Sequence, residues 1–410
     1  MAVRAKRMAA PATIRPGARV GRYRVGKLLH EGGMARLYTV EAKSPLILKV
    51  PKLGPDHPAS SLTAFENELR ILERLRGPHG PRLVAAGDLS RQPWLLLERI
   101  DGDDLARAAA LAPLPIDDLC DLGVRLSRAV QALHHQNVIH LDLNPNNVRS
   151  RADGTLVLID FGLAHHAALP DLHDSAFGEE EGTTATIAPE QLHHVRHDSR
   201  SDIYAIGAIL YQLATGHHPF GRPNLLSLKR RLVAPPPPPR VHRPDLPPWL
   251  QEIILRCLET VPDKRYATAK RIAHLLTHPD SVPDTRRAHR RQPPGLAPRG
   301  RAWARSIFQK FDDGTAARPY ERLTTSPHVL VALDLAHCTE AQKEALRRAV
   351  RRLSVAEPKA YFTCVTVVPA ADWEAARKRG RPAPDLAVLA QMRNWAQPLK
   401  FAPARMVFQV

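Results

Sequence analysis

The sequence is short of cysteine, of acidic residues and of long apolar runs. Its four cysteines, Cys120, Cys257, Cys338 and Cys364, show no CxxC spacing, which argues against a disulfide framework or a zinc site and favours a reducing cytoplasm. No run of about 18 apolar residues occurs, so we predict no membrane span. Residues 1–20 are basic and lack an apolar signal core, so we expect them to be a disordered lead-in.

Basic residues exceed acidic ones by 59 to 41, which gives a formal net charge of +18. Such a balance permits binding to nucleic acid, anionic membranes or acidic proteins. Many of the arginines lie in one Ala/Pro/Arg-rich stretch or along one helix face, so solvated surface is the simpler interpretation. A nucleic-acid-associated protein that uses the linker arginines is an alternative. It predicts salt-dependent DNA binding that is lost when residues 286–305 are deleted.

The first 277 residues have the pattern of a sheet-rich region followed by a helical one, and the 410-residue length predicts two domains. The expected strands are Arg22–Leu29, Arg36–Val40, Leu46–Val50, Leu83–Gly87 and Trp94–Glu98, with a helix over Ser61–Leu75 between the third and the fourth. The expected later helices are Asp117–His135, Asp202–Thr215, Pro248–Glu259 and Ala267–Leu276. The run Pro235–Pro239 must be extended, and a rigid loop is favoured over a ligand for a proline-recognising module.

Residues 278–327 are rich in Pro and Arg, and we interpret them as a linker. Residues 328–410 then alternate strand and helix. The expected elements are a strand His328–Asp334, a helix Thr339–Leu353, a strand Tyr361–Val368, a helix Asp385–Trp395 and a strand Arg405–Val410. This order implies a parallel sheet. Because the pattern stops in mid-strand, we interpret it as the first half of a doubly wound domain in a chain that ends early.

The helix Thr339–Leu353 carries two sequence signals. Thr339 and Gln342 form a capping box, and the apolar positions are expected to be its buried stripe. That stripe is Leu346, Val350 and Leu353, with Arg347, Arg348, Arg351 and Arg352 expected to point outward.

Two short segments carry the strongest chemical signal: HLDLNPNN at His140–Asn147 and DFG at Asp160–Gly162. Asp142 can accept the proton of a substrate hydroxyl, while Asn147 and Asp160 can hold Mg²⁺ against phosphates. An isolated DFG is mostly structural. The spacing within both segments is rare by chance, and it favours phosphoryl transfer from a nucleoside triphosphate.

A hairpin at His30–Leu37 could cover a triphosphate with backbone N–H groups. Against the pattern G-x-G-x-x-G-x-V, Gly32 matches and is followed by Gly33, whereas His30 and Ala35 replace glycines and Leu37 replaces valine. An ordinary hairpin explains this segment equally well.

Lys49 lies within an apolar strand and needs a partner, because an unpaired buried charge costs several kcal/mol. Glu66 and Glu68 on the following helix are both candidates. A strand lysine whose tip reaches water is the structural alternative. Farther along the chain, Arg265 can pair with Glu190 of Ala188-Pro189-Glu190 as structural support.

With these motifs in order, residues 21–277 resemble a bacterial eukaryotic-like serine/threonine protein kinase. The resemblance implies an α+β fold with a small lobe (residues 21–100) and a large lobe (residues 101–277), and ATP bound at the hinge. Leu97 would be the gatekeeper, and Glu98 and Ile100 would present backbone groups to adenine. Asp142 would be the base, Lys49 paired with Glu68 would align the phosphates, and Asn147 and Asp160 would bind Mg²⁺, with Mn²⁺ as an alternative. Thr183 matches the threonine that supports the base and fits serine/threonine specificity.

The departures from the family pattern are Leu141 and Asn144. Most relatives have Arg at the first position, where it binds a phosphorylated activation loop, so Leu141 predicts activity without that phosphorylation. The acidic run Glu179–Glu181 could supply permanent negative charge or be a solvated loop. Serine/threonine kinases usually have Lys at the second position, so Asn144 predicts a rate reduced on the order of 10²-fold.

The C-terminal stretch resembles the universal stress protein family through its Val329–Asp334 strand and the helix that follows, and Asp334 would lie near adenine in nucleotide-binding members. The family's glycine-rich phosphate loop follows a later strand, which the sequence lacks, so nucleotide binding there is not predicted. The whole resemblance implies an ATP- and Mg²⁺-dependent kinase of protein Ser/Thr residues, capable of autophosphorylation and acting in stress signalling. A pseudokinase scaffold that binds nucleotide is the alternative. The oligomeric state is not predicted.

Overall fold

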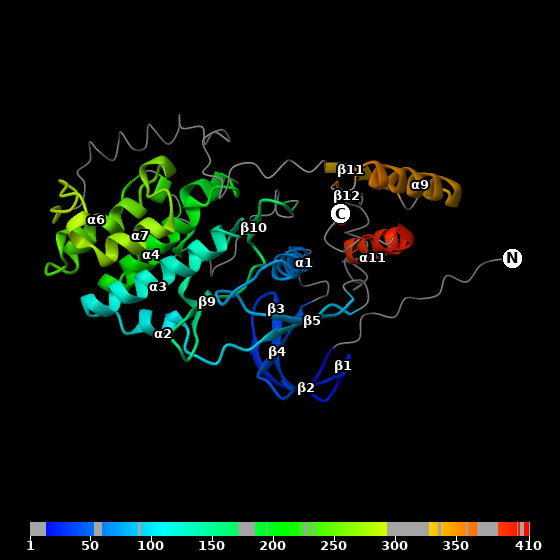
Figure 1. Cartoon of the computed structure of the whole chain (residues 1–410), viewed down its shortest axis with the longest axis horizontal. Helices are drawn as coiled ribbons and strands as arrows, with labels where there is room; N and C mark the ends of the chain where they lie inside the picture. Colours follow the sequence, from blue (N-terminus) through cyan, green and yellow to red (C-terminus); the bar gives the residue numbers. More distant parts are fainter. Residues whose placement is uncertain are drawn as a thin grey trace. The chain divides into compact units, whose positions relative to one another are not determined.

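The computed structural model describes residues 14–52, 60–88, 92–169, 171, 185–193, 195–222, 224, 228, 230–232, 234–292, 328–334, 338–357, 360–366, 384–399, 401 and 406–409 (Figure 1). The chain divides into two compact units. The first unit comprises Met1–Glu73, Arg82–Arg99 and Ser326–Val410, and the second comprises Arg74–Pro81 and Ile100–Thr325. We describe each unit by itself.

A six-stranded antiparallel sheet forms the first part of unit one. Its order is β1 (Arg19–Val20), β2 (Tyr23–Glu31), β3 (Ala35–Glu41), β4 (Leu46–Pro51), β6 (Leu95–Glu98) and β5 (Leu83–Ala86). The five expected strands are therefore confirmed, with small shifts at their ends. They are rich in Leu, Val and Ile, which pack well on a pleated surface.

The expectation of a disordered lead-in is wrong for the last residues of that segment. Ile14 is only 4% exposed and packs into the core of the sheet with Val20 and Val25. The hydroxyl of Tyr38 donates a hydrogen bond to the Ile14 carbonyl over 3.2 Å. Burial of two apolar side chains and pairing of β1 with β2 explain why the chain is ordered here despite its basic composition.

Helix α1 (Ser60–Leu72) joins β4 to β5 and confirms the expected helix, although it ends before Leu75. Every residue from Ala64 to Leu72 is buried, including the charged Glu66, Glu68 and Arg70. A helix that is buried over so much of its circumference must satisfy its charges by pairing.

The C-terminal module, residues 328–409, is the second part of unit one. It contains β11 (His328–Ala332), α9 (Glu340–Ala356), β12 (Tyr361–Val365), α11 (Pro384–Ala396), the short 3₁₀-helix η7 (Gln397–Leu399) and β13 (Met406–Gln409). The strands are parallel in the order β11-β12-β13, as expected from the alternating pattern. Phe362, Cys364, Met392 and Trp395 form the centre of its core.

Helix α9 partly departs from its prediction. The Thr339–Gln342 capping box is present and Val350 is buried, but Leu353 is 44% exposed. Arg347 and Arg351 are not simply solvated, because they donate hydrogen bonds to the carbonyls of Trp395 in the last turn of α11 and of Pro398 in η7. Those carbonyls lie where a helix has no intrahelical donors left, so long arginine side chains satisfy them.

Unit two is mainly helical. Its α-helices among the described residues are α2 (Leu105–Ala110), α3 (Ile116–His134), α4 (Arg200–Thr215), α6 (Pro248–Cys257) and α7 (Ala269–Thr277). Two short antiparallel pairs accompany them: β7 (Val138–Ile139) with β10 (His165–His166), and β8 (Val148–Ser150) with β9 (Leu156–Leu158). The four long helices predicted from periodicity are confirmed.

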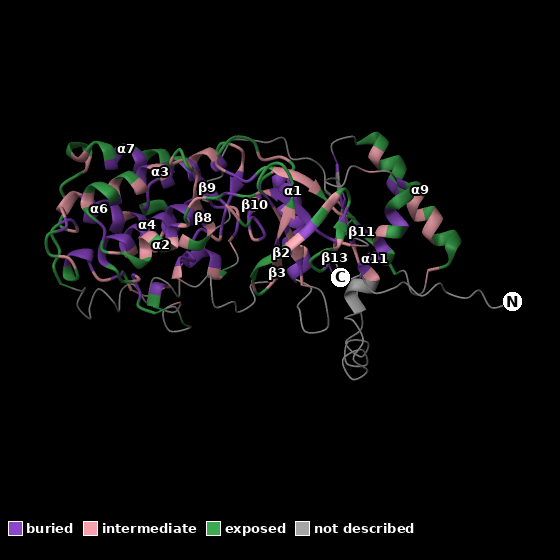
Figure 2. Cartoon of the chain, turned by 90° about the horizontal axis from the view of Figure 1, so that it is seen from below, coloured by how far each residue is buried: buried purple, intermediate pink, exposed green. Residues whose placement is uncertain are grey.

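Helix α4 is buried almost throughout, as its colour in Figure 2 shows. It approaches α6 so closely that a Cβ at Gly207 would lie 2.5 Å from the Cβ of Cys257. A larger residue at this position would force the two helices apart. Helix α4 is therefore the fixed central element to which the loops of unit two attach.

The start of the predicted linker is folded onto α6. Ala288 is 1% exposed, and the Gln251 side-chain amide donates to the carbonyls of Arg287, Ala288 and Arg290, each over 2.9 Å. Arg287 also forms a 2.5 Å ion pair with Glu252. The Pro/Arg composition therefore did not indicate that this segment packs against α6. Residues 293–327 lie outside the described part of the chain.

The proline run precedes the 3₁₀-helix η4 (Pro239–Val241), and Pro236, Pro238 and Pro239 are buried. Burial favours the rigid-loop interpretation over a ligand for another module. Among the described residues, no helix is both long enough and apolar enough to cross a membrane.

Candidate active site

The first group of site residues lies in unit one and centres on Lys49. The Nζ of Lys49, in β4, lies 2.6 Å from the Oε2 of Glu68 in α1. Their side chains are 14% and 2% exposed, so the pair is removed from water. The predicted partner is confirmed, and the alternative of a lysine reaching solvent is wrong. Such a pair holds an ammonium group at a fixed position, where it can meet phosphate oxygens.

The predicted nucleotide-covering hairpin is the β2–β3 hairpin. His30 pairs with Leu37 across the two strands, and the Gly32 N–H donates to the Ala35 carbonyl over 3.0 Å. A Cβ built at Gly33 would meet nothing within 4 Å, and one at Gly32 would meet only ordinary contacts. The hairpin itself therefore does not require glycine at either position. A requirement for glycine would have to come from a bound group above it.

Glu31 stabilises the hairpin next to its turn. Its carboxylate lies 3.1 Å from the Arg36 Nε and 3.0 Å from the Lys52 Nζ. Hydrogen bonds from Lys52 and Arg36 hold the pKa of Glu31 below its usual value. The carboxylate thus stays ionised and links β2, β3 and the residue that follows β4.

The residues expected to face adenine lie on both sides of the division between the units. Leu97, 4% exposed, and Glu98 end β6 in unit one. The Glu98 N–H is used within its own unit, since it donates to the Arg82 carbonyl over 2.9 Å. Ile100 is the first residue of the second segment of unit two, where its carbonyl accepts a hydrogen bond from the Arg149 Nε over 3.2 Å.

The second group of site residues surrounds Asp142 in unit two. The Nδ2 of Asn147 donates to the Oδ2 of Asp142 over 2.9 Å, and the Nδ2 of Asn144 donates to its Oδ1 over 3.1 Å. Both amides also donate to the Asp142 backbone carbonyl. The carboxylate is therefore held on both oxygens. Because each amide uses its nitrogen here, the amide oxygen of Asn147 is the atom it can offer to a metal ion.

Asn144 has a second role that the sequence did not reveal. Its Oδ1 accepts the Asn146 N–H over 3.0 Å, which makes it the N-cap of the 3₁₀-helix η1 (Pro145–Asn147). Lysine, the usual family residue, cannot cap a helix in this way. Asn144 therefore does more than remove the positive charge of the usual lysine, because it organises the loop and orients the predicted base.

Asp160 has a left-handed backbone, with a φ of 64°. That conformation is rare for a residue other than glycine and often marks a functional site. The next residue anchors it, since Phe161 is fully buried and its ring centroid lies 5.2 Å from that of His140. Burial lowers the pKa of His140, so its ring is neutral. Asp160 is thus an exposed carboxylate on a fixed backbone.

Asp202, at the start of α4, was missed as a site residue. Its carboxylate accepts the backbone N–H groups of His140 and Leu141 over 2.9 and 3.0 Å, and the His134 ring lies 2.9 Å away. Burial alone would raise the pKa of Asp202, but the hydrogen bond and charge of His134 and the contribution of His140 hold it below its usual value. The available signal was an acid in an otherwise apolar helix, which demands buried partners.

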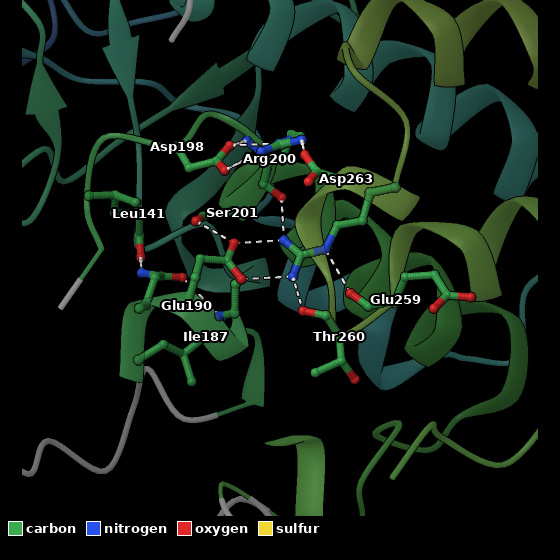
Figure 3. A network of polar contacts seen from close by, with 12 residues as sticks. Leu141, Ile187, Glu190, Asp198, Arg200, Ser201, Glu259, Thr260 and Asp263 are labelled. Atoms are coloured by element: carbon green, nitrogen blue, oxygen red, sulfur yellow. Dashed lines mark hydrogen bonds and ion pairs between the residues drawn. The ribbon is translucent and has the colours of Figure 1, made fainter. Parts of the chain in front are cut away.

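The predicted pair of Glu190 and Arg265 is confirmed as a buried network (Figure 3). The two guanidinium nitrogens of Arg265 lie 2.6 and 2.7 Å from the two carboxylate oxygens of Glu190. The Ser201 hydroxyl donates to Glu190 over 2.7 Å, and the Thr260 carbonyl accepts from Arg265 over 3.2 Å. Since every charge here has partners, the network is structural.

Leu141 is 4% exposed and has a φ of 60°. Its side chain is apolar, while its backbone carbonyl accepts a hydrogen bond from the Gln191 side-chain amide over 2.8 Å. The residue therefore supports the loop through its backbone and offers nothing to a phosphate. Glu179–Glu181 and Thr183 lie outside the described residues.

The two groups supply the charges that a nucleoside triphosphate needs. Unit one holds the Lys49 ammonium at a fixed position, and unit two holds the Asp142 carboxylate between two amides and the exposed Asp160 carboxylate. Together with an antiparallel sheet followed by a helical unit, the two groups define the class of proteins with a protein-kinase fold. The protein kinase domain family matches residues 23–279, and the chain belongs to this family.

Several curated bacterial proteins are similar to this part of the chain. A probable serine/threonine-protein kinase, PkwA of Thermomonospora curvata, is 31% identical over 271 residues, which are 64% of this chain and 35% of the relative. The DNA damage-responsive serine/threonine-protein kinase RqkA of Deinococcus radiodurans is 33% identical over 62% of this chain and 39% of its own length. The serine/threonine-protein kinase PknL of Mycobacterium tuberculosis is 30% identical over 60% of this chain and 63% of its own. The matched part thus spans less than two thirds of each relative.

Proposed function

We propose that the chain transfers the γ-phosphate of ATP to serine or threonine hydroxyls of proteins with Mg²⁺ as its metal, and that it can phosphorylate itself. The observation that carries this proposal is the pair of site groups: Lys49 fixed on Glu68 at 2.6 Å, and Asp142 held on both carboxylate oxygens by Asn144 and Asn147. The relatives named as serine/threonine kinases support the choice of acceptor.

Each residue has a distinct part in this reaction. Asp142 orients the attacking hydroxyl and takes its proton, and its two amide hydrogen bonds fix the direction of the acceptor lone pairs. Lys49 binds phosphate oxygens and is itself held by Glu68. ATP supplies a γ-phosphoryl group whose charge must be stabilised as it is transferred. Backbone N–H groups of the hairpin from His30 to Leu37 would cover that charge.

The residues present fit a magnesium ion. Mg²⁺ prefers oxygen ligands and is usually bound by one or two protein carboxylates together with phosphates and water. Asp160 offers an exposed carboxylate, and Asn147 offers its amide oxygen. No cluster of three or more metal-binding side chains occurs among the residues that the structure describes, so the phosphates would have to complete the coordination.

Autophosphorylation by the full chain tests the proposal. We expect label from γ-labelled ATP to be incorporated in the presence of Mg²⁺, and we expect Asp142→Asn to reduce the rate by about 10² or more, because the proton acceptor is lost while the side-chain size is kept. Asp153→Asn, a change at an exposed loop carboxylate, is the matched control. Incorporation that persists in Asp142→Asn would refute the assignment of the base.

A slow kinase or a nucleotide-binding scaffold is the second candidate, and Asn144 is the observation that favours it. The Asn residue removes a positive charge near the reacting phosphate, although it holds Asp142. Asn144→Lys adds the charge but removes the hydrogen bond to Asp142 and the cap of η1, as Asn144→Ala does. We expect Asn144→Lys to autophosphorylate on the order of tenfold faster than Asn144→Ala, because a positive charge stabilises the transition state. Equal rates in the two variants would mean that another group already compensates for the missing charge.

The wider setting is also part of the proposal. A universal-stress-protein-like half-domain is supported by the parallel β-α-β-α-β order of the C-terminal module, with the exposed Asp334 just after β11. A role in stress signalling and a cytoplasmic location go with this interpretation. The scattered cysteines support the location.

A further inference from the structure

Helix α1 has two charged faces. Glu68 points to Lys49, whereas Glu66 and Arg70 lie one turn apart on another face, about 200° around the helix from Glu68. Glu66 and Arg70 are 7% and 3% exposed and form a 2.7 Å ion pair. The face opposite the catalytic pair is therefore buried and charged, and the kinase chemistry does not use it.

The C-terminal module covers that face. Arg393 of α11 forms an ion pair with Glu66, and Arg70 donates a hydrogen bond to the backbone carbonyl of Met406 in β13. The Arg393 side chain is 12% exposed, and its guanidinium lies 5.9 Å from the centre of the Phe408 ring. Two elements of the module thus hold one helix of the sheet-rich part, all within the same compact unit.

The charges in this contact are complementary. Burial alone would raise the pKa of Glu66, but the charges of Arg70 and Arg393 and their hydrogen bonds hold it below its usual value. Glu66 is therefore ionised between two arginines. Removal of Arg393 would leave Glu66 with one arginine in place of two, and removal of Glu66 would take the carboxylate from both arginines, so the contact depends strongly on the position of α1.

We propose that the C-terminal module is a built-in positioning element for the catalytic ion pair, acting through Arg393 and the Met406 carbonyl on α1. The proposal rests on the kinase function proposed above. The contact is made while Glu68 is on Lys49, so it favours the paired position of the helix over any other. Arg393, Glu66 and Arg70 act through Glu68 and are positioning residues.

The test uses the full-length chain with Arg393→Met, Glu66→Gln and the two combined. Each single variant is expected to raise the KM for ATP at least about fivefold and to speed hydrogen exchange of the α1 amides without nucleotide. The double variant should show less than the product of the two single effects, because both substitutions remove the same Arg393–Glu66 ion pair. Arg352→Met, at an exposed position on α9, is the matched control and should leave both readouts unchanged.

Three results would overturn the proposal. In the first, the single variants leave the KM for ATP and the hydrogen exchange of the α1 amides unchanged. Another is fully multiplicative effects in the double variant. The third is a loss of kcat that follows the unfolded fraction while the KM stays constant, as a merely structural role would give. A wild-type chain without phosphorylation would refute the kinase function, and α1 exchange would still decide the positioning role.

Discussion

Asn144 stands where serine/threonine kinases usually have lysine, and it acts through hydrogen bonds rather than through a positive charge. Its amide bonds Asp142, and its carbonyl oxygen caps η1. We expect Asn144→Ala to lower kcat on the order of tenfold with little change in the KM for ATP, because the base loses its orientation while the phosphate-binding residues remain. Steady-state kinetics would measure this split.

The neighbouring Asn146 offers the control for that experiment. Its side chain is exposed, so Asn146→Ala should keep the wild-type kcat. A larger loss in Asn146→Ala than in Asn144→Ala would contradict the role given to the Asn144 side chain.

His166 gives a prediction for stability against pH. Burial, with the nearby charges of Arg74 and His165, lowers the pKa of His166 to about 4, so the folded chain keeps this ring neutral. The unfolded chain takes up a proton near pH 6.5, where the folded chain does not. The free energy of unfolding should therefore fall as the pH drops from about 6.5 to about 4, by about 3 kcal/mol at most, and it should be unaffected above that window.

Chemical denaturation of His166→Asn at several pH values checks this expectation. Asn can still accept the Ala168 N–H, which the His166 Nδ1 accepts over 3.0 Å in the wild type. The variant should show a shallower loss of stability with acid, whereas His135→Gln, at an exposed position, should follow the wild type. An identical slope in His166→Asn would show that other groups cause the dependence.

At the scale of elements, the start of α4 fixes the loop that carries Asp142. Asp202 accepts the N–H groups of His140 and Leu141, and both oxygens of its carboxylate are used. Asp202→Asn would place an NH₂ group against an N–H donor. We expect it to cost about 3 kcal/mol of unfolding free energy, because a buried donor loses its acceptor, and to lower kcat at least about tenfold.

Denaturation and kinetics on the same preparation would separate these two effects. Asp118→Asn, an exposed acid in the first turn of α3, should change the unfolding free energy by well under about 1 kcal/mol. A stable Asp202→Asn protein with wild-type kcat would show that the loop does not depend on α4.

The sequence predicted those elements whose stabilisation is local or periodic. The strands around Lys49, the helix carrying Glu68 and the Thr339 capping box each have a signal within a few residues. Contacts between distant segments were missed, because composition does not encode them. Ile14 in the core of the sheet lies in a basic stretch that was predicted to be a disordered lead-in, and Ala288 on α6 lies in a Pro/Arg-rich stretch that was predicted to be a linker.

The same limit applies to the site. Lys49, Glu68, Asp142, Asn147 and Asp160 were nominated by short motifs, whereas Asp202 and the cap made by Asn144 became visible only with the backbone in place. The face of α1 that binds Arg393 could not be predicted, because a glutamate and an arginine one turn apart ordinarily indicate solvated surface.

At the scale of the whole molecule, the question is how the chain is kept active. Leu141 has no charge with which to bind a phosphorylated activation loop. A carboxylate–arginine pair instead lies just beyond the Asp160–Gly162 motif, where the Nε of Arg196 is 2.7 Å from the Oδ2 of Asp171. Arg196 is 2% exposed and also donates to the Leu163 carbonyl over 2.8 Å. This permanent pair can hold the start of the segment without phosphate.

We therefore expect phosphatase-treated protein to keep its activity within about twofold, and Asp171→Asn to lower it by about tenfold or more, because the neutral amide would remove the ion pair that links Asp171 to the buried Arg196. Initial rates on an added protein substrate, measured before autophosphorylation accumulates, would compare the phosphatase-treated protein and Asp171→Asn with the untreated wild type. Thr186 is 3% exposed, so Thr186→Val keeps its volume while removing the hydroxyl and should remain active. Two results would show that this kinase depends on a phosphorylation switch. One is activity that is lost on phosphatase treatment and restored by rephosphorylation. The other is activity that Thr184→Ala alone or Thr186→Val alone abolishes.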